Sequence, residues 1–90
     1  MDGYEWDLGK ASANLRKHRV DFADAALSLE DPRALTVSDP DASGEARYVC
    51  LAADPRGRIL VTVFAYRDEN IRIISSRKAS RGEQRRYEAR

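Results

Sequence analysis

Cysteine and histidine are nearly absent from this chain, which restricts the chemistry open to it. Cys50 is the only cysteine, so an internal disulfide and a multi-cysteine zinc site are both excluded. His18 is the only histidine, and no partner is spaced to share a metal ion with it. No glycine-rich phosphate loop is present either. We therefore expect no metal site and no cofactor, and we expect Cys50 to be an ordinary buried thiol.

Long hydrophobic runs are missing as well. The first seven residues, MDGYEWD, have neither the basic nor the apolar region of a secretory signal, and no stretch is long enough to span a membrane. We therefore expect a cytoplasmic protein that makes no membrane contact. Ninety residues, 42% of them hydrophobic and 34% charged, have the size of one domain with a thin core. The expected domain comprises residues 1–90.

Positive charge is concentrated at the C-terminal end. Residues 70–90 hold seven of the 16 Lys and Arg residues and two acidic residues, which gives 7 − 2 = +5. Residues 1–69 hold the remaining nine basic and thirteen acidic residues, which gives 9 − 13 = −4. The net charge of +1 therefore conceals a polarised molecule. A local basic surface on a small protein most often binds phosphate groups, so the sequence favours a nucleic-acid partner.

Hydrophobic periodicity predicts two N-terminal helices. Asp7 and Asp21 each stand at an N-cap position, and Asp31 with Pro32 ends the second helix. The expected buried face of the first helix comprises Leu8, Ala11, Leu15 and His18. That of the second comprises Phe22, Ala25, Ala26 and Leu29. Two short helices should therefore pack against the rest of the fold.

Beyond Pro32 the period changes to two, which predicts strands. The strand segments are 34–38, 45–53, 59–66 and 71–75. Short turns separate the last three strands, so an antiparallel meander is the economical topology. Tyr4 to Trp6 form a strand-like lead-in, and we expect Trp6 to be buried. The expected fold is α+β: two helices, a four-stranded antiparallel meander and a C-terminal helix.

The last helix begins with a capping box. Ser80 and Glu83 have the Ser-x-x-Glu spacing in which each side chain bonds the other residue's backbone. Gly82 lies in the first turn and weakens the helix by about 1 kcal/mol relative to alanine.

Three local strings resemble one known family. They are YEWDLGKASANLRKHRVDF near the start, EDP after the second helix, and IRIISSRKASRGEQRRYE at the end. In this order, and over nearly the whole chain, they resemble the BrnT family, toxins of bacterial type II toxin–antitoxin pairs. The resemblance implies a RelE-like fold and metal-independent RNA cleavage that arrests growth. It also implies a BrnA-like, DNA-binding antitoxin. The toxin would then contact DNA only indirectly, through this antitoxin.

Two positions depart from the family pattern. The family usually has glycine after Lys17 and His18, as a left-handed helix end requires, whereas this chain has Arg19. We therefore expect a different loop after the first helix. At Gly82 the family commonly has a polar or basic residue. Glycine has no such side chain, so the difference implies one phosphate contact fewer and reduced toxicity.

Metal-independent RNA cleavage needs cations that hold the negative charge of the phosphorane. Arginine suits this role because it stays charged and grips two phosphate oxygens at once, so Arg72, Arg77 and Arg81 form the expected phosphate-binding set. If the isoleucines beside Arg72 face the core, Arg72 faces the open side of the sheet, where RNA would lie. We expect these guanidinium groups to converge on one anion. The alternative is a solvated Arg72, with Arg77 in a salt bridge to Glu83.

RNA cleavage also needs groups that transfer protons. Histidine ordinarily titrates near neutral pH, so His18 is the natural candidate, with Lys17 beside it as an electrostatic helper. Tyr87 and Glu83 lie four residues apart on one helix face and could donate and accept protons. The alternatives are a packed His18, a solvated Lys17 and a Glu83 that serves only the capping box.

The remaining C-terminal cations form a basic track whose binding should weaken with salt. They are Lys78, Arg85, Arg86 and Arg90. This track could equally be the landing site of an acidic antitoxin. Besides RNA cleavage, two functions stay open: a nucleic-acid-binding module without catalysis, and a protein-interaction domain.

Overall fold

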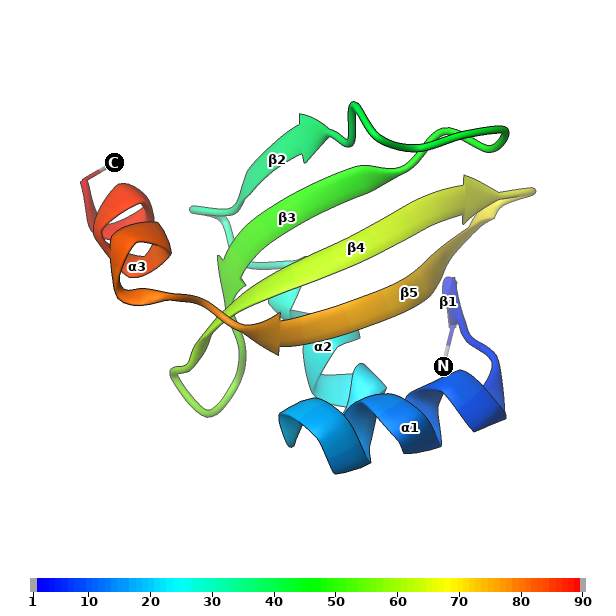
Figure 1. Ribbon diagram of the computed structural model, residues 1–90, viewed down its shortest axis with the longest axis horizontal. Helices are drawn as coiled ribbons and strands as arrows, with labels where there is room; N and C mark the ends of the chain where they lie inside the picture. The colour runs from blue at the N-terminus through cyan, green and yellow to red at the C-terminus, as the bar shows by residue number, and fades with distance from the viewer. Residues whose placement is uncertain (1, 90) are drawn as a thin grey trace.

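The structure is a computed structural model that describes residues 2–89. The elements are β1 (Tyr4–Glu5), α1 (Leu8–His18), α2 (Phe22–Ser28), β2 (Leu35–Ser38), β3 (Tyr48–Ala53), β4 (Ile59–Arg67), β5 (Asn70–Lys78) and α3 (Arg81–Glu88). The predicted α+β class is confirmed, as is the antiparallel meander of β2 to β5. The prediction was one strand short. β1 pairs in parallel with β5, which gives the order β1-β5-β4-β3-β2 (Figure 1).

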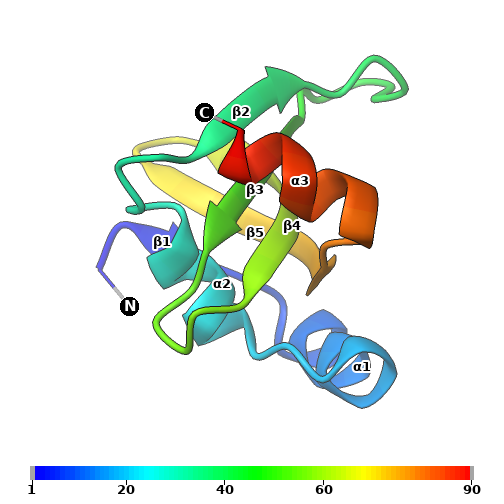
Figure 2. The same cartoon turned by 90° about the vertical axis from the view of Figure 1, so that its left-hand side faces the viewer.

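The helices lie on different parts of the sheet. α1 and α2 lie beneath it as drawn in Figure 1, and α3 lies at its left-hand end, the end that faces the viewer in Figure 2. The core between the sheet and α2 comprises Val20, Phe22, Ala25, Ala26, Cys50, Ala52, Leu60, Phe64 and Ile73. Full burial of a side chain such as Phe22 or Leu60 contributes about 1.5–3 kcal/mol. Cys50 is buried as predicted, and burial raises the pKa of its thiol.

A second, smaller cluster attaches α3 to the opposite face of the sheet. It comprises Leu51, Val61, Ala79 and Tyr87. Successive strand residues point to opposite faces, so this cluster and the main core use alternate residues of β3 and β4. Beyond α3 this second face is uncovered by other elements of the described chain, and we call it the open face (Figure 2).

A β-bulge decides which residues of β5 lie on the open face. Phe64 pairs with Ile73 and Val63 with Ser75, so Ile74 has no opposite residue. The extra residue shifts the alternation by one position. Arg72 and Arg77, which are five residues apart, therefore lie on the same face, whereas strict alternation would separate them.

The predicted buried face of α1 is wrong for both of its leucines. Leu8 is 79% exposed and Leu15 is 46% exposed, whereas Asn14 is only 7% exposed. Nδ2 of Asn14 donates to the carbonyl oxygens of Ser76 (2.8 Å) and Val20 (3.1 Å), and the Ser76 N–H donates to its Oδ1 (3.1 Å). β1 pairs with β5 only as far as Arg72. The edge beyond is free for an asparagine, so a polar side chain holds the helix.

The end of α1 also differs from expectation. Asp7 caps its start as predicted, and its carboxylate accepts from the Lys10 N–H at 2.8 Å. At the other end Arg19 adopts the left-handed conformation, with φ 60° and ψ 30°. The expected change of loop is therefore wrong: arginine takes the glycine-like geometry, which costs roughly 1 kcal/mol. Its carbonyl oxygen accepts from Arg58 Nη1 at 3.0 Å, which helps to hold the turn.

The N-terminal aromatic residue is less buried than predicted. Trp6 is half-buried, and its ring lies at 80° to the ring of Phe22, with ring centroids 6.2 Å apart. It covers the rim of the core and does not fill its centre. The second N-cap is confirmed, because the Ala23 N–H donates to Asp21 Oδ1 at 3.0 Å.

Candidate functional site

A groove of about 250 Å³ lies between α1 and β5, and we call it the α1–β5 groove. It is lined by Lys10, Ala13, Asn14, Lys17, His18, Ile74 and Ser75. The helix residues among them share one face by their spacing of three and four. None of the lining residues is acidic, so the groove presents positive charge and an imidazole without a neutralising carboxylate in its wall.

The hydrogen bonds of Asn14 set the geometry of this groove. They fix α1 to the backbone of Ser76, next to Ser75 on the groove wall. Lys17 and His18 follow Asn14 by one turn, so they are brought to the same wall. The sequence pattern predicted these two residues together, and the structure places both in the groove. Lys17 is exposed and His18 is half-buried.

Arg72 lies on the open face, as predicted, but it is paired with a carboxylate. Its Nη1 donates to Glu5 Oε2 at 2.9 Å, and the two side chains are 25% and 30% exposed. Asn70 Nδ2 also donates to Glu5, at 3.2 Å. The bonds from Asn70 and Arg72 lower the pKa of Glu5. A guanidinium has five N–H donors, so this pairing leaves Arg72 with further donors for another anion.

Arg77 is held more completely. Its Nη1 and Nη2 donate to the two carboxylate oxygens of Glu83 at 2.9 and 3.0 Å. Glu83 also accepts from the Ser80 N–H at 2.7 Å and so completes the predicted capping box. The bonds from Arg77 and Ser80 lower the pKa of Glu83 to about 2. A carboxylate with so low a pKa is a weak base, which disfavours Glu83 as a proton acceptor at neutral pH.

The expected convergence of arginines on one anion does not occur. Arg72 lies opposite Ala65 and Arg77 opposite Val61, four residues apart along β4. At a strand rise of about 3.3 Å per residue, this separation is roughly 13 Å. Each of the two guanidinium groups binds its own carboxylate. The salt bridge from Arg77 to Glu83 was the alternative that the sequence left open.

Tyr87 lies away from the α1–β5 groove. It is 8% exposed on the opposite side of the sheet, and its hydroxyl donates to Asp31 Oδ2. The guanidinium carbon of Arg33 lies 5.7 Å from its ring centroid. This contact set anchors α3, and it does not bring Tyr87 to Lys17 or His18.

Asp31 has a role that the sequence did not reveal. It joins the end of α2, the end of β3 and α3, because its carboxylate also accepts from the N–H groups of Ala53 (2.9 Å) and Arg33 (3.0 Å). Burial alone would raise the pKa of Asp31, but the bonds from Tyr87 and the two N–H groups outweigh it and lower the pKa. The Asp-Pro pair indicated only a helix end. No sequence signal pointed to its distant partners.

The C-terminal cations divide into two kinds. Lys78, Arg81, Arg85 and Arg86 are all exposed, and Arg86 alone among them also lines a second hollow on the open face. Arg90 lies outside the described residues. Gly82 is exposed in the first turn of α3 with open space around its Cα.

Within residues 2–89, no three His, Cys, Asp or Glu side chains lie close enough to hold a metal ion. Among the described helices, none has the length and apolar character needed to cross a bilayer.

Both the sequence and the fold are similar to those of known proteins. The model of a family described as "Ribonuclease toxin, BrnT, of type II toxin-antitoxin system" matches residues 6–83. Among solved structures, the crystal structure of the Brucella abortus ribonuclease toxin BrnT is similar, with a TM-score of 0.62 and 25% sequence identity. The similarity covers 84% of this chain and 94% of that chain. No curated protein matches the sequence. The matched range contains the α1–β5 groove in full, and it ends before Arg86 and Tyr87.

Proposed function

The chain belongs to the family of BrnT ribonuclease toxins of type II toxin–antitoxin systems. We propose that it cleaves RNA without a metal ion and so arrests growth. Membership implies a cognate antitoxin. We propose that this antitoxin is DNA-binding and of the BrnA type, and that both proteins act in the cytoplasm. The observation that carries the catalytic proposal is the α1–β5 groove, which lies wholly within the matched residues.

The reaction proposed for this groove is attack by the RNA 2′-hydroxyl on the adjacent phosphorus. The 2′-hydroxyl loses its proton, the bond from phosphorus to the 5′-oxygen breaks, and that oxygen gains a proton. His18 is the proton-transfer group, since it is the one imidazole in the chain and lines the groove. Lys17 and Lys10 lie on the same wall and hold the charge of the phosphorane.

Arg72 is proposed to bind the RNA backbone on the open face. Its spare N–H donors are available to a phosphate oxygen while Glu5 holds the guanidinium in place. Arg77 and Glu83 already satisfy each other, so we propose that they position α3 and do not contact the reacting phosphate. This division of roles follows from the partners that each side chain already has.

The test is cleavage of RNA by purified protein in the presence of EDTA. Wild-type protein should cleave, and Lys17→Ala should slow cleavage at least tenfold. Arg16→Ala is the matched control: it removes one positive charge from the same helix, but Arg16 points to Ser12, outside the groove. Equal losses in the two variants, or RNA that stays intact with wild-type protein, would count against the groove.

Growth arrest is tested separately by induced expression. Wild-type protein should stop growth, Lys17→Ala should not, and the gene beside the toxin gene should restore growth when co-expressed. A second function, RNA binding without cleavage, is favoured by one observation: the basic side chains of Lys78, Arg81 and Arg85 are exposed, and they can bind phosphate without transferring a proton. In that case RNA would be retained by the protein but recovered intact.

A further inference from the structure

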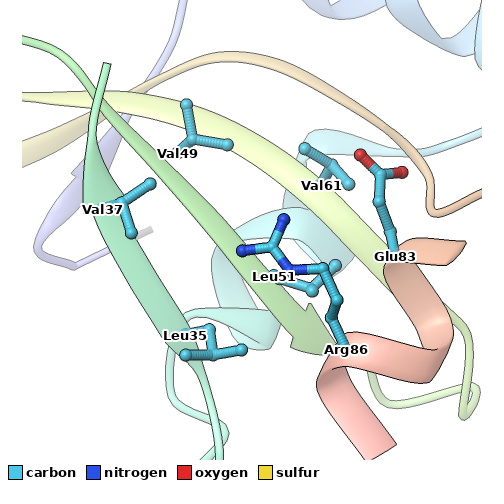
Figure 3. Close-up of a pocket in the computed structure, with 7 residues that line it drawn as sticks. All are labelled: Leu35, Val37, Val49, Leu51, Val61, Glu83 and Arg86. Atoms are coloured by element: carbon cyan, nitrogen blue, oxygen red, sulfur yellow. The ribbon is translucent and has the colours of Figure 1, made fainter. Parts of the chain in front are cut away.

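A second hollow lies on the open face, between strands β2 to β4 and helix α3, and we call it the β2–α3 groove (Figure 3). Its volume is about 80 Å³. It is lined by Leu35, Val37, Val49, Leu51, Val61, Glu83 and Arg86. The floor is aliphatic and the two charged residues come from α3 (Figure 3). The hollow has room for an aliphatic side chain.

The apolar floor continues to an exposed edge of the sheet. β2 is the last strand in the sheet order, and its outer edge pairs with no strand of residues 2–89. Val37 on this strand is 55% exposed, and Leu35 and Val49 are half-buried. An unpaired edge strand with exposed aliphatic side chains favours association with another chain.

Arg86 adds an unneutralised charge to this apolar surface. Its side chain extends from α3 over the strands (Figure 3), and it forms no ion pair or side-chain hydrogen bond within the described part of the chain. The carboxylate of Glu83, the other charged residue of the groove, already forms a salt bridge with Arg77. The β2–α3 groove therefore combines an aliphatic floor with one cation that needs an anionic partner.

From these features we infer that the β2–α3 groove is the docking site of the cognate antitoxin, which would supply an amphipathic acidic segment. An aliphatic side chain of that segment fills the hollow, and a neighbouring carboxylate pairs with Arg86. The inference rests on the proposed function only in that it takes the partner to be the antitoxin. RNA fits this groove poorly, because the lining has no aromatic ring on which a base could stack. It also has only one cation that lacks a partner, which is few for binding the phosphate backbone.

Docking at this groove also suggests how the toxin is silenced. Arg72 lies on the same open face, on β5, three strands away from β2. Neighbouring strands are about 4.8 Å apart, so the distance across the sheet is roughly 14 Å. A segment that continues from the groove along the sheet would cover the surface proposed for the RNA backbone. The antitoxin would then exclude RNA without entering the α1–β5 groove.

The test measures the affinity of full-length toxin variants for the purified product of the short gene beside the toxin gene. Val37→Lys places a charge in the groove at an exposed position, and it should weaken binding at least tenfold. Leu8→Lys is its control, because Leu8 is 79% exposed on α1, away from the groove. Arg86→Glu should also weaken binding at least tenfold, whereas Arg85→Glu, on the same helix outside the groove, should change it by about twofold or less.

RNA cleavage by each free variant separates this inference from the proposed function. Val37→Lys should cleave RNA at the wild-type rate but escape the antitoxin. Wild-type affinity in both Val37→Lys and Arg86→Glu would overturn the docking site, whatever the cleavage result. A loss of RNA retention by Arg86→Glu, with antitoxin affinity unchanged, would assign the groove to RNA instead. Failure of the wild-type protein to cleave RNA would contradict only the proposed function, since the comparison of antitoxin affinities does not depend on cleavage.

Discussion

Replacement of Asn14 by alanine should be among the most destabilising changes in α1, although the residue is polar. Asn14 is 7% exposed and makes three hydrogen bonds to backbone groups of Ser76 and Val20. A buried hydrogen bond contributes about 1 kcal/mol net, so Asn14→Ala should lower the free energy of unfolding by roughly 3 kcal/mol. This is a large share of the about 5–15 kcal/mol that stabilises a typical domain.

Leu15→Ala is the matched control on the same helix. Leu15 is 46% exposed, so this change should lower the free energy of unfolding by less than about 1 kcal/mol. Asn14→Asp should cost at least as much as Asn14→Ala near neutral pH, because a carboxylate would face two carbonyl oxygens. Periodicity alone predicts the opposite order for Asn14 and Leu15.

Urea denaturation measures these differences directly. Trp6 is the only tryptophan and is half-buried, so its fluorescence can follow unfolding in every variant. The midpoint should fall with little change in the slope of free energy against urea. A larger loss for Leu15→Ala than for Asn14→Ala would refute the account of how α1 is held on the sheet.

Three further changes test other contacts. Arg19→Gly should raise the free energy of unfolding by about 0.5–1 kcal/mol in urea denaturation, because it relieves the left-handed conformation at φ 60°; a loss of stability would contradict that reason. Tyr87→Phe should lower the free energy of unfolding by about 1.5–3 kcal/mol, because it removes the hydrogen bond to the Asp31 carboxylate. The variant should still cleave RNA, and a stable variant without activity would show that Tyr87 is catalytic. The pKa of Glu83 falls from 4.5 to about 2 on folding, so its stabilisation should be complete above pH 4.5 and lost as the pH falls toward 2. The stability difference between wild type and Glu83→Gln should close over that range, and a constant difference would speak against the salt bridge to Arg77.

The sequence predicted features that depend on neighbouring residues. The caps at Asp7, Asp21 and Ser80 are local hydrogen bonds between residues two or three apart, so their spacing revealed them. The meander followed from alternation and short turns. The grouping of Lys17 and His18 likewise needed only adjacency on one helix.

Features that depend on distant contacts were missed. Asn14 is buried because the edge of β5 beyond β1 is open, and Asp31 joins segments up to 56 residues apart. The bulge at Ile74 leaves no pattern in the sequence, yet it decides the faces of Arg72 and Arg77. The convergence of arginines failed for a related reason. Charge counting shows the number of cations but not which carboxylates lie beside them.

The most direct test of the central claim is the single-turnover rate of RNA cleavage by His18→Gln in EDTA. If the α1–β5 groove is the catalytic centre, this variant should keep its fold and its RNA affinity but cleave at least about 100-fold more slowly than wild type. Cleavage at the wild-type rate would show that no proton passes through His18, and the reaction would have to be placed elsewhere on the molecule.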